Sequence, residues 1–305
     1  MATIYFAKVN YNNMHEIYHE KRSLQEINKK VFSLLNINTI YKKIEIKKTD
    51  TGDEVEKQKE FEFFNLERYN NDIIIGNLIK KDYLYLKKLN KATEEVELRK
   101  EENDESILFF YDTQNEVIAF HKNQRFGHLE FIQGFEGLLN LIFDKEEEKF
   151  TIGLYNNNIS IDEVFDDLKK IGKIKELTIE VIPPNVNSEE LEEIKKEQDR
   201  VLKQLDEANV TRKTTLYKSN TKKGINIENS MILDNINEFR YLNKNWSEVD
   251  ILNRTYGEIT ATSMSGQKYT SKSSKPLKYE IEDENKNRRG FLTYMKDIIA
   301  NIIPR

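Results

Sequence analysis

The sequence contains no cysteine. This absence excludes disulfide bridges, thiolate metal ligands and a cysteine nucleophile, and it favours a reducing, intracellular compartment. No apolar run reaches the roughly 18 residues that a membrane-spanning helix needs. The first residues, Met1–Asn10, lack the basic stretch and apolar segment of a secretory signal. We therefore expect a cytoplasmic protein without membrane insertion.

The motifs of common nucleotide-binding and hydrolytic enzymes are also missing. The chain has neither G-x-G-x-x-G nor G-x-x-x-x-G-K-[ST], so no loop is suited to cradle the phosphates of a nucleotide. It also lacks G-x-S-x-G, the motif that presents a nucleophilic serine. These absences weigh against ATPases, dehydrogenases and acyl-transfer enzymes. The sequence assigns no cofactor, no resident metal and no catalytic residue.

Charge is abundant and unevenly distributed. Charged residues make up 33% of the 305 residues, and the net charge is −5. From Val210 to Arg305 there are 17 Lys and Arg against 11 Asp and Glu, a net of +6, so the preceding residues sum to −11. This asymmetry favours a polyanionic partner that is bound by the C-terminal part of the chain only.

Helix signals occur in both halves of the chain. Ser23–Glu26 and Ser160–Glu163 each match a capping box, in which the Ser oxygen accepts an amide N–H and the Glu reaches back. Apolar residues at helical spacing follow both boxes. Further helices are expected over 129–143, where two glycines weaken the prediction, over 187–208, over 229–242, and from Phe291 to Ile302.

Strands are indicated by apolar runs bounded by turn residues. The clearest hairpin joins Ser106–Tyr111 to Glu116–Phe120 through Asp112–Asn115. A second hairpin is expected over Glu258–Lys278, with Met264–Gln267 as its turn. Other strands are expected over 3–9, 40–46, 61–66, 72–79 and 177–182.

Helical and strand periodicities together predict an α+β fold of two lobes, with mixed or antiparallel sheets and flanking helices. The acidic run Lys145–Glu148 suggests a boundary near residue 150, which gives domains 1–150 and 151–305. The second domain would carry the basic loop and hairpin. We expect the apolar face of the final helix, which carries Phe291, Met295 and Ile299, to lie in the core, with pairing of two copies as the alternative.

The segment His15–His19 matches H-E-x-x-H. On a helix this spacing directs two histidines at one metal ion and places a glutamate beside the bound water. A third ligand is required, and the sequence singles out neither His121, His128 nor any acid. A chance match at a solvated helix start is the favoured interpretation, and zinc hydrolysis through His15, Glu16 and His19 is the enzymatic alternative.

Two further patterns admit a catalytic interpretation. His121 and His128 flank Arg125, which suits a metal or phosphate site but equally an ordinary polar loop. Glu45–Ile46–Lys47 is similar to the E-x-K segment of Mg²⁺-dependent nucleases, where carboxylates hold the metal and Lys steadies the nucleophile. Because no partner acid is identifiable, alternating charge on an exposed strand face is favoured.

Cations and hydroxyl side chains occur together in the C-terminal part of the chain. Lys and Arg supply charge to phosphate oxygens, while Ser and Thr supply short hydrogen-bond donors. A loop and a hairpin of this composition could contact the backbone on both sides of a duplex, with little recognition of base sequence. The alternative interpretation is that these charged residues form an ordinary solvent-exposed surface. The predicted nucleic-acid-binding residues are Arg212, Lys213, Lys218, Lys222, Lys223, Lys268, Lys272, Lys275, Arg288 and Arg289.

The order of elements resembles that of the RexA-like phage-exclusion proteins of prophages and bacterial defence islands. Three segments carry the resemblance: the hairpin Ser106–Phe120, the helix, strand and proline of Ile161–Asn185, and the strand, glycine turn and strand of Tyr256–Leu277. The resemblance implies a homodimer that binds duplex DNA with little sequence preference. It also implies a membrane-located effector protein that causes abortive infection.

In that family, basic residues on the C-terminal hairpin strand contribute to DNA binding. The corresponding positions here are Thr260 and Thr262, so Lys268, Lys272 and Lys275 on the return strand would have to substitute. The sequence thus predicts a non-enzymatic DNA-binding protein of bacterial antiviral defence. The alternatives are a metal-dependent hydrolase or nuclease, and a protein-interaction module that docks through the charged helix 189–207.

Overall fold

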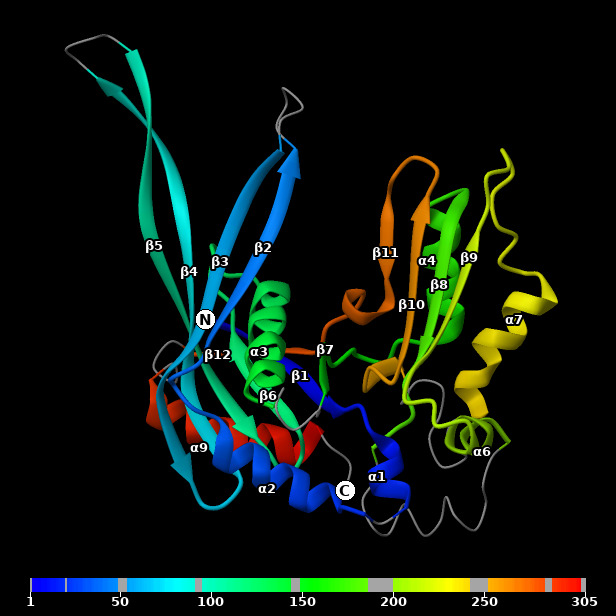
Figure 1. Cartoon of the computed structure of the whole chain (residues 1–305), viewed down its shortest axis with the longest axis horizontal. Helices are drawn as coiled ribbons and strands as arrows, with labels where there is room; N and C mark the ends of the chain where they lie inside the picture. The colour runs from blue at the N-terminus through cyan, green and yellow to red at the C-terminus, as the bar shows by residue number, and fades with distance from the viewer. Residues whose placement is uncertain are drawn as a thin grey trace.

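The computed structural model describes residues 2–19, 21–48, 54–90, 95–143, 149–185, 200–241, 252–282 and 287–302. Figure 1 shows two β-sheets that lie next to each other and are accompanied by helices. All strand pairs in both sheets are antiparallel, so the predicted α+β class is confirmed and the sheets are antiparallel, not mixed. Within these ranges, no helix combines the length and apolar composition that crossing a bilayer requires.

The first sheet contains β1 (Ala2–Tyr11), β2 (Ile40–Lys48), β3 (Glu54–Tyr69), β4 (Ile73–Asn90), β5 (Glu95–Asp112), β6 (Val117–His121), β7 (Phe150–Leu154) and β12 (Lys278–Ile281). Its order is β12-β1-β6-β5-β4-β3-β2, and β7 pairs with the C-terminal part of β1. The β2–β3 and β4–β5 hairpins reach far beyond the helices (Figure 1). The predicted hairpin around Asp112–Asn115 is confirmed as β5–β6.

Helices cover both faces of the first sheet, and the alternation of its strands explains why. On β1 and β5, Tyr5 and Phe109 point into a core shared with α3 (His128–Ile142) and α2 (Leu24–Leu34). Their neighbours Phe6 and Phe110 point into a second core under α9 (Arg288–Ile302). Phe291, Met295 and Ile299 of α9 are buried there, as expected.

The second sheet is formed by β8 (Ile174–Val181), β9 (Lys213–Lys218), β10 (Gly257–Ser263) and β11 (Lys268–Thr270), in the order β11-β10-β8-β9. Accompanying it are α4 (Ile161–Lys170), α6 (Arg200–Glu207), α7 (Ser230–Asn237) and the short 3₁₀ helices η2 (Glu238–Tyr241) and η3 (Ser271–Ser273). The predicted turn at Met264–Gln267 is confirmed, with Gly266 at φ +86°.

Local helix signals match the structure where a capping side chain is present. Ser23 and Ser160 each accept the N–H of the Glu three residues later, at the starts of α2 and α4. The helix expected over 187–208 is seen from Arg200 as α6, and residues 186–199 lie outside the described ranges, as does Pro304.

The end of the chain returns to the first sheet. β12 pairs with β1, and α9 packs on the face that α3 leaves uncovered. The apolar core of the α3 face also continues into the second sheet through Leu177, Ile179 and Ile259. The boundary expected near residue 150 falls at the start of β7, a strand of the first sheet.

Candidate functional sites

The ten cations predicted to bind nucleic acid occupy different parts of the molecule. Arg288 contacts Glu67 and Asn77 beside the first sheet, and the exposed Arg289 follows it on α9. Six of the ten pair with a carboxylate: Arg212 with Glu180, Lys213 with Glu238, Lys218 with Glu176, Lys272 with Glu258, Lys275 with Glu163, and Arg288 with Glu67. Much of their charge is therefore balanced within the protein.

The return strand of the C-terminal hairpin is shorter than the sequence indicates. β11 ends at Thr270. The hydroxyl of Thr270 accepts the Lys272 N–H at 3.3 Å and so caps the start of η3. The buried Ser271 hydroxyl accepts the Ile259 N–H at 2.9 Å, which draws the chain across β10. Lys268 therefore lies on the strand, whereas Lys272 and Lys275 lie beyond it.

A smaller group of lysines does come together, at the end of the second sheet where β8 begins. We call Lys173, Lys175, Lys222, Lys223 and Lys268 the basic tip; all five are exposed. Backbone hydrogen bonds join their three segments. The Met264 N–H donates to the Lys173 carbonyl at 2.8 Å, and the Ser219 N–H donates to the Lys175 carbonyl at 2.9 Å. Figure 1 shows these segments at the upper end of the second sheet.

The lysines of the basic tip differ from their neighbours in charge balance. Lys169 pairs with Glu228, Lys170 with Asp167 and Lys218 with Glu176. Among the described residues, no ion pair involves a lysine of the basic tip. This end of the second sheet therefore presents five exposed lysines that form no ion pair among the described residues.

Gly224 holds the loop of Lys222 and Lys223 against β8. Its φ is +79°, and a Cβ atom there would lie 2.9 Å from the Ile174 carbonyl oxygen. The next residue, Ile225, donates its N–H to that same carbonyl at 2.9 Å. A groove of about 380 Å³ lies between this loop and the α4–β8 link, with Lys173 and Lys223 in its lining.

Lys173 and Lys175 are not among the residues that the sequence analysis selected. Both lysines lie before Val210, in the part of the chain whose net charge is negative. The signal was nevertheless present, since Lys169, Lys170, Lys173 and Lys175 fall within seven residues. What the sequence does not reveal is that this run lies beside the loop of Lys222 and Lys223.

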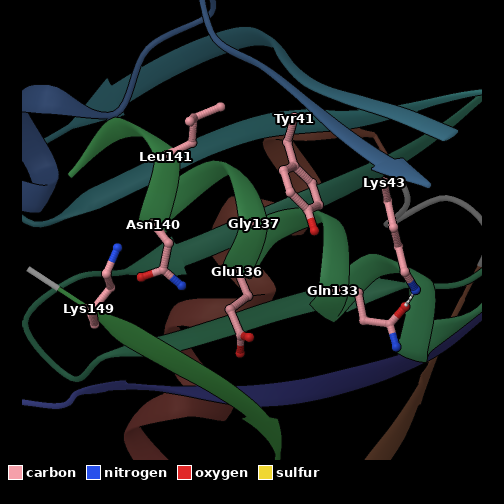
Figure 2. A pocket seen from close by; sticks show the side chains of 8 residues that line it. All are labelled: Tyr41, Lys43, Gln133, Glu136, Gly137, Asn140, Leu141 and Lys149. Carbon is pink, nitrogen blue, oxygen red and sulfur yellow. Dashed lines mark hydrogen bonds between the residues drawn. The ribbon is translucent and has the colours of Figure 1, made fainter. Parts of the chain in front are cut away.

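A second groove, of about 510 Å³, lies between β2 and α3 (Figure 2). Its polar side chains bind other parts of the protein. Glu136 accepts the Ile152 N–H at 2.6 Å, Asn140 exchanges hydrogen bonds with the Phe150 backbone, and Lys43 donates to Gln133. Burial raises the pKa of Glu136. The groove holds no combination of acid, base and nucleophile, and its side chains attach β7 and β2 to α3.

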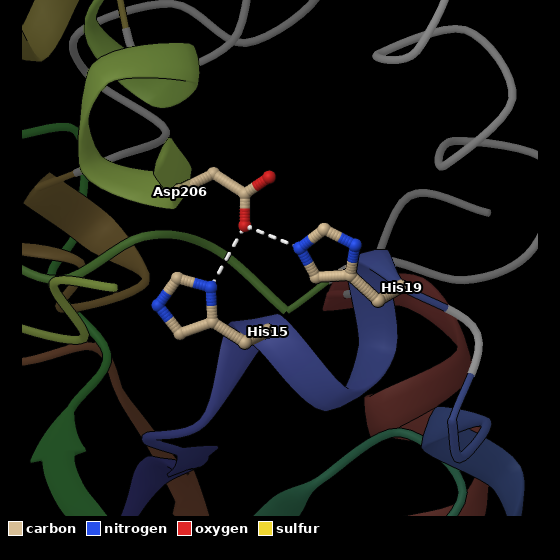
Figure 3. Close-up of side chains that lie close together, drawn as sticks. All are labelled: His15, His19 and Asp206. Atoms are coloured by element: carbon tan, nitrogen blue, oxygen red, sulfur yellow. Dashed lines mark hydrogen bonds and ion pairs between the residues drawn. The ribbon is translucent and has the colours of Figure 1, made fainter. Parts of the chain in front are cut away.

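The histidines of H-E-x-x-H meet an aspartate from the second half of the chain (Figure 3). They lie at the two ends of the short helix α1 (Met14–Tyr18). His15 Nδ1 is 2.8 Å and His19 Nε2 is 3.1 Å from the same oxygen, Oδ1 of Asp206 on α6. Within the described ranges, this is the only group of three side chains placed to hold a metal.

The glutamate of the motif is held by other partners. Glu16 Oε2 accepts the Tyr11 hydroxyl at 2.8 Å and Arg22 Nη1 at 3.2 Å. Both contacts are made by the same carboxylate oxygen. The arrangement therefore offers three ligands, while the glutamate of the motif is bonded to Tyr11 and Arg22.

The remaining candidate patterns do not assemble. Burial lowers the pKa of His128, whose ring stacks on Tyr5 at 4.9 Å, and Arg125 lies 4.0 Å from Glu105. Glu45 is paired with Lys43 and Lys59 instead of a second carboxylate, and a hydrogen bond from Lys43 lowers its pKa. The side chain of Lys47 is outside the described part of the structure.

No curated protein matches the sequence significantly. The family model described as "Domain of unknown function (DUF4747)" matches residues 3–299, which include both sheets, the basic tip and the group of His15, His19 and Asp206. The chain therefore belongs to the DUF4747 family.

Proposed function

We propose that this protein binds duplex nucleic acid through the basic tip, by contacts with phosphates and without reading base sequence. The observation that carries the proposal is the convergence, at one end of the second sheet, of five exposed lysines that pair with no carboxylate among the described residues. An ammonium group is a compact point charge with three donors, which suits phosphate oxygens. It lacks the planar fork of arginine that pairs with a guanine edge.

The surroundings of the tip suit a phosphate chain. Ser219 and Thr221 precede Lys222 in the loop after β9, and Gln267 precedes Lys268; their side chains can donate short hydrogen bonds to phosphate oxygens. The residues before Val210 sum to −11, so most of the molecule repels a polyanion. Repulsion elsewhere would orient a duplex towards the tip and make association sensitive to salt.

The cellular setting of the proposal comes from the resemblance to RexA-like phage-exclusion proteins. By analogy, DNA binding would serve bacterial antiviral defence, with two copies on one duplex and a separate effector protein. Two copies would double the number of phosphate contacts and steepen the dependence of affinity on salt.

The test is a salt titration of a fluorescent duplex with the full chain. The double variant Lys222→Gln/Lys223→Gln is compared with Arg289→Gln/Lys296→Gln, which removes the same charge from exposed positions of α9. Each phosphate contact contributes about 0.9 to the slope of log K against log[salt], or roughly eightfold in affinity at 0.1 M salt. The tip variant should bind about 60-fold more weakly, with a slope reduced by about two.

Three results would count against the proposal: equal losses in both variants, a wild-type affinity that does not change with salt, or strong preference for one sequence. Duplexes of DNA and RNA are tested in parallel. Incubation with plasmid and Mg²⁺ or Mn²⁺ separates binding from cleavage, and nicking by the wild-type protein would favour the nuclease alternative instead.

A further inference from the structure

We infer that His15, His19 and Asp206 form a binding site for a first-row transition-metal ion, with zinc as the expected occupant, that joins α1 to α6. The inference is independent of nucleic-acid binding, because the site lies on α1 and α6 and uses no lysine of the basic tip. His15 and His19 come from one turn, four residues apart, and Asp206 comes from the C-terminal part of α6.

The distances suit a tetrahedral metal. Zinc binds nitrogen and carboxylate oxygen at about 2.0–2.2 Å, so neighbouring ligands of a tetrahedral site are about 3.4 Å apart. Here the two nitrogen-to-oxygen separations are 2.8 and 3.1 Å, and all three ligand atoms lie within 4.8 Å of one another. The two nitrogen-to-oxygen separations would have to lengthen by roughly 0.3–0.6 Å to reach the tetrahedral spacing.

Burial is uneven across the group. The side chains of His15 and Asp206 are 12% and 15% exposed, whereas that of His19 is 54% exposed. A metal would therefore be held by two shielded ligands and reached from the His19 side, where a water molecule could occupy the fourth position. Two imidazoles and one carboxylate favour zinc, cobalt, nickel or copper over magnesium and calcium, which prefer oxygen ligands.

One atom of the group lacks a hydrogen bond. Nε2 of His15 is buried, and no described residue bonds to it. Nε2 lies across the ring from Nδ1, which faces Asp206, so it leaves a buried donor or acceptor for a water beside the proposed ion and does not itself mark the ion. The two imidazole nitrogens that face Asp206 are the atoms that would bind the metal.

The position of Glu16 favours a structural metal over a hydrolytic one. Its Oε2 atom is bonded to Tyr11 and Arg22, so the carboxylate is already engaged by two partners other than the three ligands. Next to it on α1, Ile17 and Tyr18 are buried, and the Tyr18 hydroxyl donates to the Pro184 carbonyl at 3.2 Å. The metal would thus replace the contacts of His15 and His19 with Asp206 by a stronger connection between α1 and the second half of the chain.

Metal binding is measured with the full chain after dialysis against a chelator. Titration with Co²⁺ reports geometry through visible absorption, and competition with Zn²⁺ gives the affinity. The wild type should bind one ion with tetrahedral absorption, and Zn²⁺ should raise its thermal midpoint. Asp206→Asn and His19→Gln should each weaken binding by more than the 10- to 100-fold that loss of an outer-shell partner costs.

Glu16→Gln is the matched control, since it changes the same motif without removing a ligand. It should retain the Co²⁺ spectrum and the Zn²⁺ affinity. His19 is half exposed, so His19→Gln is expected to fold even if Asp206→Asn does not. Less than about 0.2 equivalents of bound Co²⁺, an octahedral spectrum, or equal affinity in wild type and both ligand variants would overturn the site. Zinc-dependent peptide hydrolysis lost in Glu16→Gln would overturn its structural role.

Discussion

At the scale of single residues, one buried ion pair joins β1 to the central hairpin. Lys8 Nζ lies 2.7 Å from Glu116 Oε2, and the two side chains are 10% and 5% exposed. Burial opposes the charged lysine, but the charge and hydrogen bond of Glu116, together with Tyr256 and Tyr155, outweigh it, and the pKa of Lys8 is raised. Because the folded pKa is raised, the contribution of the pair is complete at neutral pH and is lost only in strong alkali.

Glu116→Gln leaves the Lys8 ammonium buried without an opposite charge. We expect the free energy of unfolding at pH 7 to fall by about 3–5 kcal/mol, the usual cost of removing one partner from a buried pair. Glu176→Gln is the control, because its pair with Lys218 is 40% and 63% exposed and should contribute under about 1 kcal/mol. Urea unfolding measures both variants, and equal effects would contradict the prediction.

The charge of Glu136, unlike that of Lys8, destabilises the folded state at neutral pH. Burial raises its pKa, so the ionised side chain destabilises the folded state above that raised value, and the penalty disappears below the ordinary pKa of 4.5. Glu136→Gln keeps an oxygen that can accept the Ile152 N–H and removes the charge. The variant should therefore be more stable than wild type at pH 7, with a gain that vanishes below pH 4.5. Thermal midpoints from pH 3.5 to 8 test this, and a gain independent of pH would argue against it.

At the scale of elements, α3 shows why the sequence was a poor guide to its middle. Gly134 and Gly137 weaken a helix by propensity, yet α3 runs from His128 to Ile142 without interruption. A Cβ at either glycine would lie 2.3 Å from a ring, that of Phe61 on β3 or of Tyr41 on β2. The glycines let the helix approach the sheet, and that tertiary reason is not visible in local periodicity. The capping boxes of α2 and α4 were predictable because all their contacts lie within four residues.

Gly134→Ala should destabilise the protein although alanine favours a helix by about 1 kcal/mol. The ring of Phe61 is fully buried and cannot move aside, so we expect a net loss of about 1–3 kcal/mol from overpacking. Gly127→Ala, at the start of the same helix, meets no atom within 4 Å and should cost less than about 1 kcal/mol. Chemical denaturation measures the free energy of unfolding of both variants. A Gly134→Ala variant more stable than the wild type would contradict the predicted overpacking.

The loop after β9 offers an element-scale test of the basic tip. Gly224→Ala adds a contact with the Ile174 carbonyl at a positive φ, which should move Lys222 and Lys223 away from β8. Gly172→Ala is strained in the same way, at φ +84°, but meets no atom within 4 Å. Gly224→Ala should lose at least as much stability as Gly172→Ala, and only Gly224→Ala should bind a duplex several-fold more weakly in fluorescence anisotropy. Equal binding would show that the loop position does not matter.

At the scale of the whole molecule, the candidate sites depend on contacts between distant parts of the chain. Asp206 meets His15 across 191 positions, and the basic tip joins the α4–β8 link to loops 44 or more residues later. The residue types of both sites were recognisable in the sequence. Their assembly was not, because a carboxylate or lysine in one helix or loop carries no local mark of the element it will face.

The return of β12 and α9 to the first sheet leads to a prediction about folding units. A fragment of residues 1–150 would lack nearly all of β7 and would have neither β12 nor α9, leaving Ile4, Phe6 and Phe110 uncovered on one face. An exposed apolar face of that kind promotes association and deprives the sheet of a stabilising layer. We expect the fragment to show no cooperative thermal transition by circular dichroism and to aggregate, whereas the full chain unfolds in one transition because its core continues into the second sheet.

Co-expression with residues 151–305 is the control, since it restores the missing strands and helix in trans and should recover a soluble complex. A soluble 1–150 fragment with a sharp transition of its own would show that the sheet is stable without its C-terminal elements, and that the link between the two sheets contributes little to folding.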